Sequence, residues 1–199
     1  LPANAPIIAS LRLPAEYAVS AAQLLGEEEF LKRLESRLRG GLKLLQLREK
    51  ELSREALPEL AWKVCRLAHR FGARVLLNSD EELARETGAD GVHLTAQALM
   101  RLEVRPQGML VAASCHDAAE LAQAMKLELD FAVLGSVKAT RSHPGAATLG
   151  WDRFTQLARG ATLPVYAIGG LSPADTEDAW RSGAHGIAMS TGAWANRQY

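Results

Sequence analysis

The chain has 199 residues, 48% of them hydrophobic, and its 23 basic and 23 acidic residues give a formal net charge of zero. This length and composition suit one domain with a sizeable core. The balanced charge argues against a general surface for nucleic acid or membrane, and no apolar run reaches the length of a membrane-spanning helix. Two cysteines, Cys65 and Cys115, fit a reducing compartment without a disulfide framework, so we expect a cytoplasmic protein.

The first 14 residues contain three prolines, which predict an extended lead-in or an interdomain linker. Residues 15–199 are then expected to form one domain. Because the chain begins with Leu1 rather than Met, we keep open that the native polypeptide extends before Leu1.

Short apolar runs alternate with segments of helical spacing along the rest of the chain. The runs that predict strands are residues 17–19, 42–47, 75–78, 91–94, 111–114, 131–135, 165–168 and 186–189. The segments that predict helices are residues 27–39, 53–70 (capped by Ser53), 81–87, 117–126, 151–158 and 172–183. Strands this short and apolar are typical of parallel strands buried on both faces. Eight strand–helix units therefore favour a single-domain (β/α)8 TIM barrel over an open doubly wound sheet.

Small residues follow the last two predicted strands, and a barrel of this kind carries its chemistry at such carboxyl ends. Gly169 and Gly170 follow one strand, and Ser190 and Thr191 follow the other. Glycines let backbone N–H groups approach an anion, and the helix predicted to begin at Ser172 adds a favourable dipole. The pattern predicts a phosphate site. The alternative is that the glycines only form tight turns.

Two cations and an amide follow the second predicted strand. Gln46, Arg48 and Lys50 alternate with a period of two, so they point the same way while the strand continues. Such a group suits a phosphate or pyrophosphate. The alternative is a polar cluster that Glu49 or Glu51 balances.

Two histidines lie near other strand ends. His116 directly follows the fifth strand, where an imidazole can serve as donor or base, or can orient a loop. His93 is expected to be a hydrogen-bonded residue near the barrel interior. The hydroxyl- and cation-rich residues 135–145 predict either a lid over a ligand or an ordinary surface loop.

Six sequence blocks occur together and in order. They are QLREK (46–50), LLN (76–78), GADGVHL (88–94), SCH (114–116), GSVKATRSHP (135–144), and AIGG followed by GAHGIAMST (within 167–191). With these blocks, residues 15–195 resemble the thiamine phosphate synthase/TenI superfamily, whose fold is a (β/α)8 barrel. Its synthases join a hydroxymethylpyrimidine pyrophosphate to a thiazole phosphate with Mg²⁺. Its TenI-type members are thiazole tautomerases that need no metal.

The resemblance implies two groups of ligand-binding residues. Gln46, Arg48, Lys50 and Asn78 would face the pyrophosphate side. The residues implied for the thiazole phosphate are Gly169, Gly170 and Ser190, with Thr140 and Ser142 in the covering loop.

The chain departs from the family at the residues that carry both reactions. The two metal-binding aspartates of the synthases fall on Ser79 and Ala98, and Asp80 is shifted by one residue from the first of them. The synthase lysine of the covering loop falls on His143, and the catalytic histidine of the tautomerases falls on Ser136. We therefore expect no metal or other cofactor, with Mg²⁺ as the alternative.

These observations predict a barrel that binds a small phosphate ester of the thiazole phosphate or thiamine phosphate type. One alternative is an active synthase (a transferase), or a tautomerase (an isomerase) that would use His116 or His143 as its base. A second is an accessory domain of a Nudix hydrolase of the MutT type, because barrels with a Pro-rich lead-in resemble the C-terminal half of such fusions. A third is a scaffold that assists dimerisation. A homodimer is compatible with each.

Overall fold

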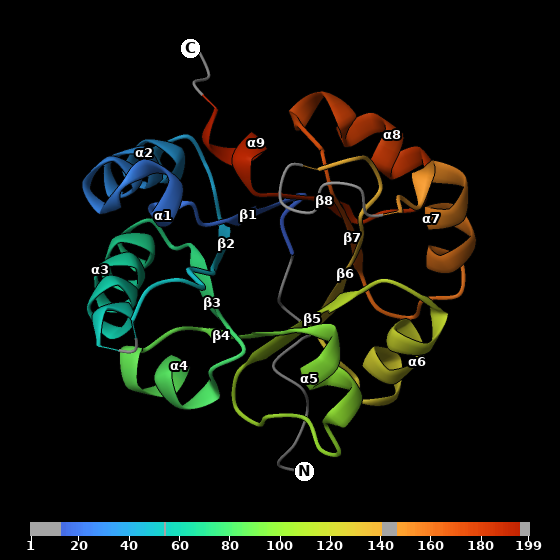
Figure 1. Cartoon of the computed structure of the whole chain (residues 1–199), viewed down its shortest axis with the longest axis horizontal. Coiled ribbons are helices and arrows are strands. Elements are labelled where there is room, and N and C mark those ends of the chain that lie inside the picture. Colours follow the sequence, from blue (N-terminus) through green and yellow to red (C-terminus); the bar gives the residue numbers. More distant parts are fainter. Residues whose placement is uncertain (1–12, 54, 141–146, 196–199) are drawn as a thin grey trace, which may run out of the picture.

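The fold is a closed barrel of eight parallel strands, each paired with its neighbours in chain order (Figure 1). This computed structural model describes residues 13–53, 55–140 and 147–195. The strands are β1 (Glu16–Val19), β2 (Leu44–Leu47), β3 (Arg74–Asn78), β4 (Gly91–Leu94), β5 (Leu110–Cys115), β6 (Phe131–Gly135), β7 (Val165–Ile168) and β8 (Gly186–Met189). β1 pairs with β8 in the register Glu16↔Ile187, which closes the barrel. The predicted single-domain (β/α)8 architecture is confirmed.

The helices surround the strands, as Figure 1 shows. They are α1 (Ala22–Leu25), α2 (Glu27–Arg39), α3 (Ala56–Arg70), α4 (Glu81–Thr87), α5 (Ala96–Arg101), α6 (Ala118–Lys126), α7 (Gly150–Ala158), the 3₁₀ turn η2 (Pro173–Asp175), α8 (Thr176–Arg181) and α9 (Thr191–Trp194). Among the described residues, no helix combines the length and the apolar character needed to cross a bilayer.

Apolar side chains pack in two layers. One layer lies between the strands and the helices and includes Phe30, Val64 and the buried Cys65. The other fills the barrel interior, where Tyr17 contacts Phe131 and Tyr166 with ring centroids 5.2 and 5.8 Å apart. These rings fill the barrel interior, and Tyr17 also lines the cavity described below.

The chain that enters β1 seals the amino-terminal end of the barrel. The Tyr166 hydroxyl donates to the carbonyl of Pro14, and the His185 Nε2 lies 2.9 Å from the carbonyl oxygen of Leu13. The Leu13 side chain packs against the interior cluster.

Two details of the sequence prediction for the helices are wrong. Ser53 is not the N-cap of α3, because the helix begins at Ala56, although the Ser53 Oγ accepts a hydrogen bond from the Ala56 N–H (3.2 Å). The helix expected over residues 172–183 divides into η2 and α8, and α8 ends at Arg181. Ser172 does cap this segment, through a reciprocal pair of hydrogen bonds with Asp175.

Candidate functional site

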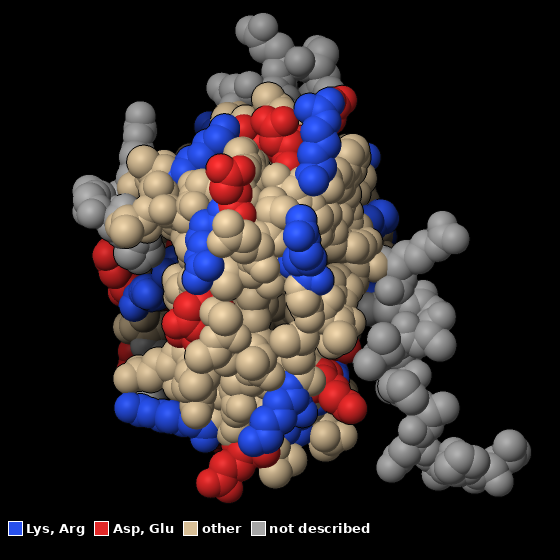
Figure 2. Space-filling model, turned by 90° about the vertical axis from the view of Figure 1, so that its right-hand side faces the viewer, with Lys and Arg blue, Asp and Glu red and all other residues tan. Residues whose placement is uncertain are grey.

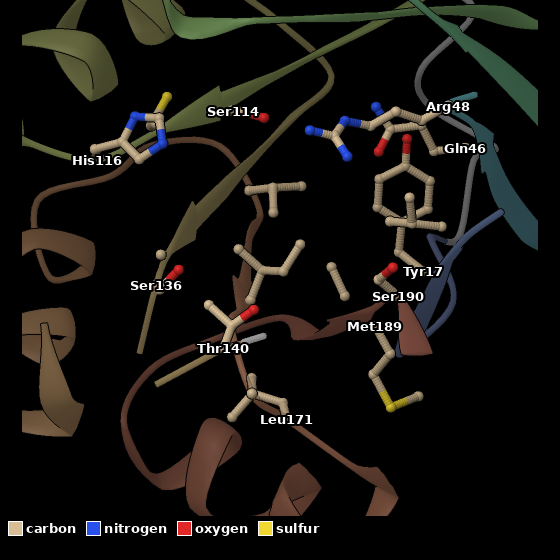
Figure 3. Close-up of a pocket in the computed structure, with 18 of the residues that line it drawn as sticks. Tyr17, Gln46, Arg48, Ser114, His116, Ser136, Thr140, Leu171, Met189 and Ser190 are labelled. Atoms are coloured by element: carbon tan, nitrogen blue, oxygen red, sulfur yellow. The ribbon is translucent and has the colours of Figure 1, made fainter. Parts of the chain in front are cut away.

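A cavity of about 910 Å³ opens at the carboxyl ends of the strands. Ten of the residues that the sequence singled out line it, from six different strands or strand exits. They are Gln46, Arg48, Lys50, Asn78, His116, Thr140, Gly169, Gly170, Ser190 and Thr191. Figure 3 shows Arg48 and Ser114 at one end of this cavity, with Thr140 and Leu171 toward the other. Ser142 and His143 lie outside the described residues.

Arg48 brings a half-buried positive charge to one end of the cavity. Burial lowers the pKa of its guanidinium from the ordinary value, and the nearby Glu49 charge opposes that change. Within the described residues, no carboxylate forms an ion pair with Arg48 or with the exposed Lys50. A cation that gives up hydration without a directly paired carboxylate favours the binding of an anion.

The Glu49 carboxylate is used elsewhere. It is buried, and its two oxygens accept hydrogen bonds from the backbone N–H groups of Ala22 and Gln23, each at 2.9 Å. Glu49 therefore holds the start of α1, which does not support the alternative that it balances the cations by direct pairing.

Amide side chains from β2 and β3 lie beside Arg48. The Gln46 Nε2 donates to the Asn78 Oδ1 at 3.2 Å. This bond orients the Asn78 Nδ2 as a remaining donor. Gln46, Arg48 and Lys50 all reach the cavity even though β2 ends at Leu47.

The β7 and β8 exits supply backbone N–H groups to the cavity. Gly170, Thr191 and Gly192 line it, and the structure shows no acceptor for their amides among the described residues. Amides without an internal acceptor are suited to bind phosphate oxygens. Close packing also requires glycine at positions 169 and 170. A Cβ on Gly169 would lie 2.6 Å from the Ser136 Cα, and one on Gly170 would lie 2.3 Å from the Ala139 carbonyl oxygen.

The expected contribution of the next helix dipole is not supported. The Asp175 carboxylate already occupies the start of η2, where its Oδ2 accepts from the Ser172 N–H (2.8 Å) and hydroxyl (3.0 Å). Its Oδ1 pairs with the Lys138 ammonium. Any phosphate at this end of the cavity depends on the loop amides rather than on α8.

A buried hydrogen-bonded chain runs below Arg48. The Tyr17 hydroxyl lies 3.1 Å from the His93 Nδ1, and the His93 Nε2 lies 3.0 Å from the Ser114 Oγ. Burial, together with the nearby Arg48 charge, lowers the pKa of His93 to about 3, so the imidazole is neutral at pH 7. His93 is thus an interior hydrogen-bonded residue, as the sequence predicted.

His116 lies at the rim of the cavity. Its ring is 62% exposed, and its Nδ1 lies 3.0 Å from the Glu120 Oε2. Ser136, at the position of the tautomerase histidine, also lines the cavity.

The residues at the metal-ligand positions of the synthases do not fit Mg²⁺. Ala98 has no oxygen in its side chain, and the Ser79 Oγ accepts a hydrogen bond from the Thr95 N–H at 3.1 Å. The Asp80 carboxylate accepts from the Leu83 N–H at 2.9 Å and caps α4. In the part of the chain that the structure describes, no group of three or more His, Cys, Asp or Glu side chains could hold a metal ion.

Sequence reasoning did not single out Tyr17 or Ser114 as site residues, although both line the cavity. Ser114 follows Leu110 and Ala112, which face the barrel interior, at a period of two. That alternation was the available signal. Tyr17 lies in an apolar strand, where no alternation of polar side chains marks it as a cavity residue.

Comparisons with known proteins agree on one family. The profile of the family "Thiamine monophosphate synthase" matches residues 16–193. The chain is 31% identical to the thiamine-phosphate synthase of Thioalkalivibrio sulfidiphilus over 188 residues, which cover 92% of this chain and 89% of that protein. It is 35% identical to a Geobacter sulfurreducens protein that carries the name thiamine-phosphate synthase provisionally, over 87% of this chain and 83% of that protein.

A solved structure has the same fold. The thiamine phosphate pyrophosphorylase of Pyrococcus furiosus superposes with a TM-score of 0.75 at 22% identity and covers 88% of this chain and 85% of that one. From the profile match and the sequence relatives together, the chain belongs to the thiamine monophosphate synthase family.

Proposed function

We propose that this barrel binds a small phosphate ester, of the phosphorylated thiazole or thiamine phosphate type, in the cavity at the carboxyl ends of its strands. One observation carries the proposal. In one cavity, a half-buried arginine that no described carboxylate pairs with lies at one end, and backbone amides for which the described residues give no acceptor lie at the other. Both features cost stability unless an anion or water satisfies them.

The walls between these two ends suit an organic body. Val133, Ile168 and Met189 line the cavity together with the polar groups. A ligand with an apolar ring and a phosphate fits such a lining better than a free inorganic anion does. The names of the relatives support a ligand from thiamine chemistry.

Calorimetric titration with thiamine phosphate and with the thiazole phosphate tests the proposal. Wild type should bind at least one of them. Arg48→Met should weaken that binding by at least about tenfold, because a charge-assisted hydrogen bond contributes about 1.5–3 kcal/mol. Arg159→Met, which removes an exposed cation at the end of α7, is the matched control and should bind as wild type does. Equal affinities in all three proteins would refute the proposed site.

A second candidate function rests on His116 and Glu120. The Nδ1 of His116 pairs with Glu120, which leaves Nε2 to exchange a proton with a bound ligand. This pair favours an isomerase that transfers a proton, and the proposed proton transfer involves no metal ion.

A tautomerisation assay should lose turnover in His116→Ala. His69→Ala is the control, since His69 is also partly exposed and paired with a carboxylate, Asp90. Retained turnover in His116→Ala would exclude this base.

Coupling of a pyrimidine pyrophosphate to the thiazole phosphate belongs in the same assay series. The synthase reaction of the family uses Mg²⁺, and the described residues at Ser79, Asp80 and Ala98 do not fit that ion. We expect no coupling product.

The proposal also allows for a regulatory role beside a fused Nudix hydrolase. The Pro-rich residues 1–14 support it through their likeness to the lead-in of such fusions. The coding sequence upstream of Leu1 tests this directly: a Nudix carboxylate motif there would support the role, and its absence would refute it.

A further inference from the structure

The buried chain of Tyr17, His93 and Ser114 has a direction that its hydrogen bonds determine. Tyr17 is fully buried, and its hydroxyl has to donate to some acceptor because buried polar groups are almost always paired. Among the described residues, the His93 Nδ1 at 3.1 Å is the partner that the structure gives this hydroxyl. For Nδ1 to accept, it must carry no proton.

The other ring nitrogen follows from this. A neutral imidazole carries one proton, so Nε2 of His93 is the protonated nitrogen and donates to the Ser114 Oγ at 3.0 Å. An imidazolium ion, with both nitrogens protonated, would leave the Tyr17 hydroxyl without an acceptor in the described structure. Burial of His93 and the nearby Arg48 charge also disfavour that ion.

Ser114 is the end of the chain and lies on the cavity wall. Because its oxygen accepts from His93, its own hydroxyl proton remains to be donated, and the structure gives it no acceptor among the described residues. Figure 3 shows the Ser114 hydroxyl and the Arg48 guanidinium at the same end of the cavity. The Ser114 hydroxyl and the Arg48 guanidinium are then both hydrogen-bond donors at this end of the cavity.

We infer that Tyr17 and His93 are positioning residues that leave the Ser114 hydroxyl proton to be donated into the cavity, so that Ser114 and Arg48 together bind an anionic oxygen acceptor at this end. Tyr17 holds one tautomer of His93, and that tautomer sets the direction of the Ser114 hydroxyl. The ligand part of this inference rests on the proposed anion-binding function, whereas the tautomer does not.

The first experiment reads the tautomer without any ligand. Long-range ¹H–¹⁵N correlation spectra of the labelled protein should show His93 with a protonated Nε2 and an unprotonated Nδ1 at pH 7. Tyr17→Phe removes the donor to Nδ1 and should convert His93, wholly or in part, to the other tautomer. Tyr166→Phe is the control, because it removes a neighbouring buried hydroxyl that donates to Pro14 instead. A wild-type His93 with the proton on Nδ1 would overturn the inference.

The second experiment reads the consequence with inorganic pyrophosphate as the probe, by calorimetry. Ser114→Ala should weaken binding about tenfold, as expected for one hydrogen bond to a charged group. Tyr17→Phe should weaken it severalfold in the wild-type background and not at all in the Ser114→Ala background, because Tyr17 acts only through Ser114. Tyr166→Phe should bind as wild type does.

The outcomes separate this inference from the proposed function. Additive effects of Tyr17→Phe and Ser114→Ala would overturn the coupling through His93. Absence of pyrophosphate binding in wild type would count against the proposed anion site, and the spectra would still decide the tautomer. If Tyr17→Phe does not fold, the wild-type spectrum alone confirms or refutes the assignment.

Discussion

At the scale of single residues, Ser79 and Asp80, which lie where the family resemblance implies a metal site, make other hydrogen bonds in this structure. Ser79 adopts a left-handed backbone conformation with φ of 56°, and its Oγ accepts from the Thr95 N–H. Asp80 caps α4. The β3 and β4 exits, where the family places its metal, are tied to each other and to a helix by these bonds.

Asp80 is therefore predicted to contribute to stability and not to metal binding. Asp80→Ala should lower the free energy of unfolding by about 1 kcal/mol, the usual value for an N-cap. Asp117→Ala, which removes the equivalent cap of α6, should cost about the same. Urea denaturation measures both. In wild type, Mg²⁺ should leave the affinity for pyrophosphate nearly unchanged. A large gain with Mg²⁺ that Asp80→Asn abolishes would show that Asp80 is a metal ligand.

Gly170 gives a second prediction at this scale. Its φ is +62°, and an added Cβ would lie 2.3 Å from the Ala139 carbonyl oxygen, so the β6–α7 loop has to shift. Gly170→Ala should lower the free energy of unfolding by about 1–3 kcal/mol and should weaken thiamine phosphate binding. At Gly160 an added Cβ meets no atom within 4 Å. Gly160→Ala should therefore change stability by less than about 0.5 kcal/mol. Equal effects of the two substitutions would contradict the close approach.

At the scale of elements, the sequence predicted the bounds of those helices and strands that local interactions determine. The bounds of α2 and α4 and of β4 and β6 match the sequence prediction to the residue. The helix α4 illustrates why: Asp80 caps it at one end, and Gly88 ends it in a left-handed conformation. Both signals lie within the segment itself.

Elements that depend on distant residues were missed. The start of α1 is held by the Glu49 carboxylate, which accepts hydrogen bonds from the backbone N–H groups of Ala22 and Gln23. These residues lie 27 and 26 positions before it in the sequence. The helices α1 and α9 have four residues each, too few for a helical period to be read. The six-residue α5 does have a local signal, because the Thr95 side chain caps it, and the sequence analysis did not use it.

The candidate site likewise has residues that the sequence predicted and residues whose role only the fold shows. Period-two alternation predicted that Gln46, Arg48 and Lys50 lie at the same end of the barrel, and all three line the cavity. The use of Glu49 and the pairing of Asp175 with Lys138 could not be predicted. These carboxylates bind backbone amides or a lysine that only the folded barrel brings near.

The Lys138–Asp175 pair predicts a pH dependence of stability. Burial alone would raise the pKa of Asp175, but hydrogen bonds from Lys138 and Ser172 outweigh it and lower the pKa from 3.8. A carboxyl with a lowered folded-state pKa stabilises the fold above its unfolded pKa, and this contribution is lost as the pH falls toward the folded value. Wild type should therefore exceed Asp175→Asn in stability by more at pH 7 than at pH 3.

Urea denaturation of both proteins at the two pH values measures this difference. Lys138→Met removes the partner and should reduce the pH-dependent part. A difference between wild type and Asp175→Asn that stays constant, or grows toward pH 3, would contradict the assignment.

At the scale of the whole molecule, charge is balanced and mixed. On the face in Figure 2, Lys and Arg side chains are interspersed with Asp and Glu, and neither sign forms a continuous patch. With a formal net charge of zero, the molecule provides little long-range attraction for an anion. Affinity for a phosphate ester must therefore arise inside the cavity, from Arg48, Ser114 and the loop amides.

Ligand binding should accordingly stabilise the barrel as a unit. The cavity is lined by residues from all eight strands or their exits, so a bound ligand lies among elements around the whole closed sheet. Thiamine phosphate at about 100 times its dissociation constant should add about 2.7 kcal/mol to the free energy of unfolding. For a domain of this size, that corresponds to a rise of roughly 5–10 °C in the melting temperature. In Arg48→Met, tenfold weaker binding at the same ligand concentration leaves about 1.4 kcal/mol, so the rise should fall to about half or less, and it should persist in full in Arg159→Met. An undiminished rise in Arg48→Met would contradict the proposed site, because the half-buried cation would then contribute nothing to the affinity.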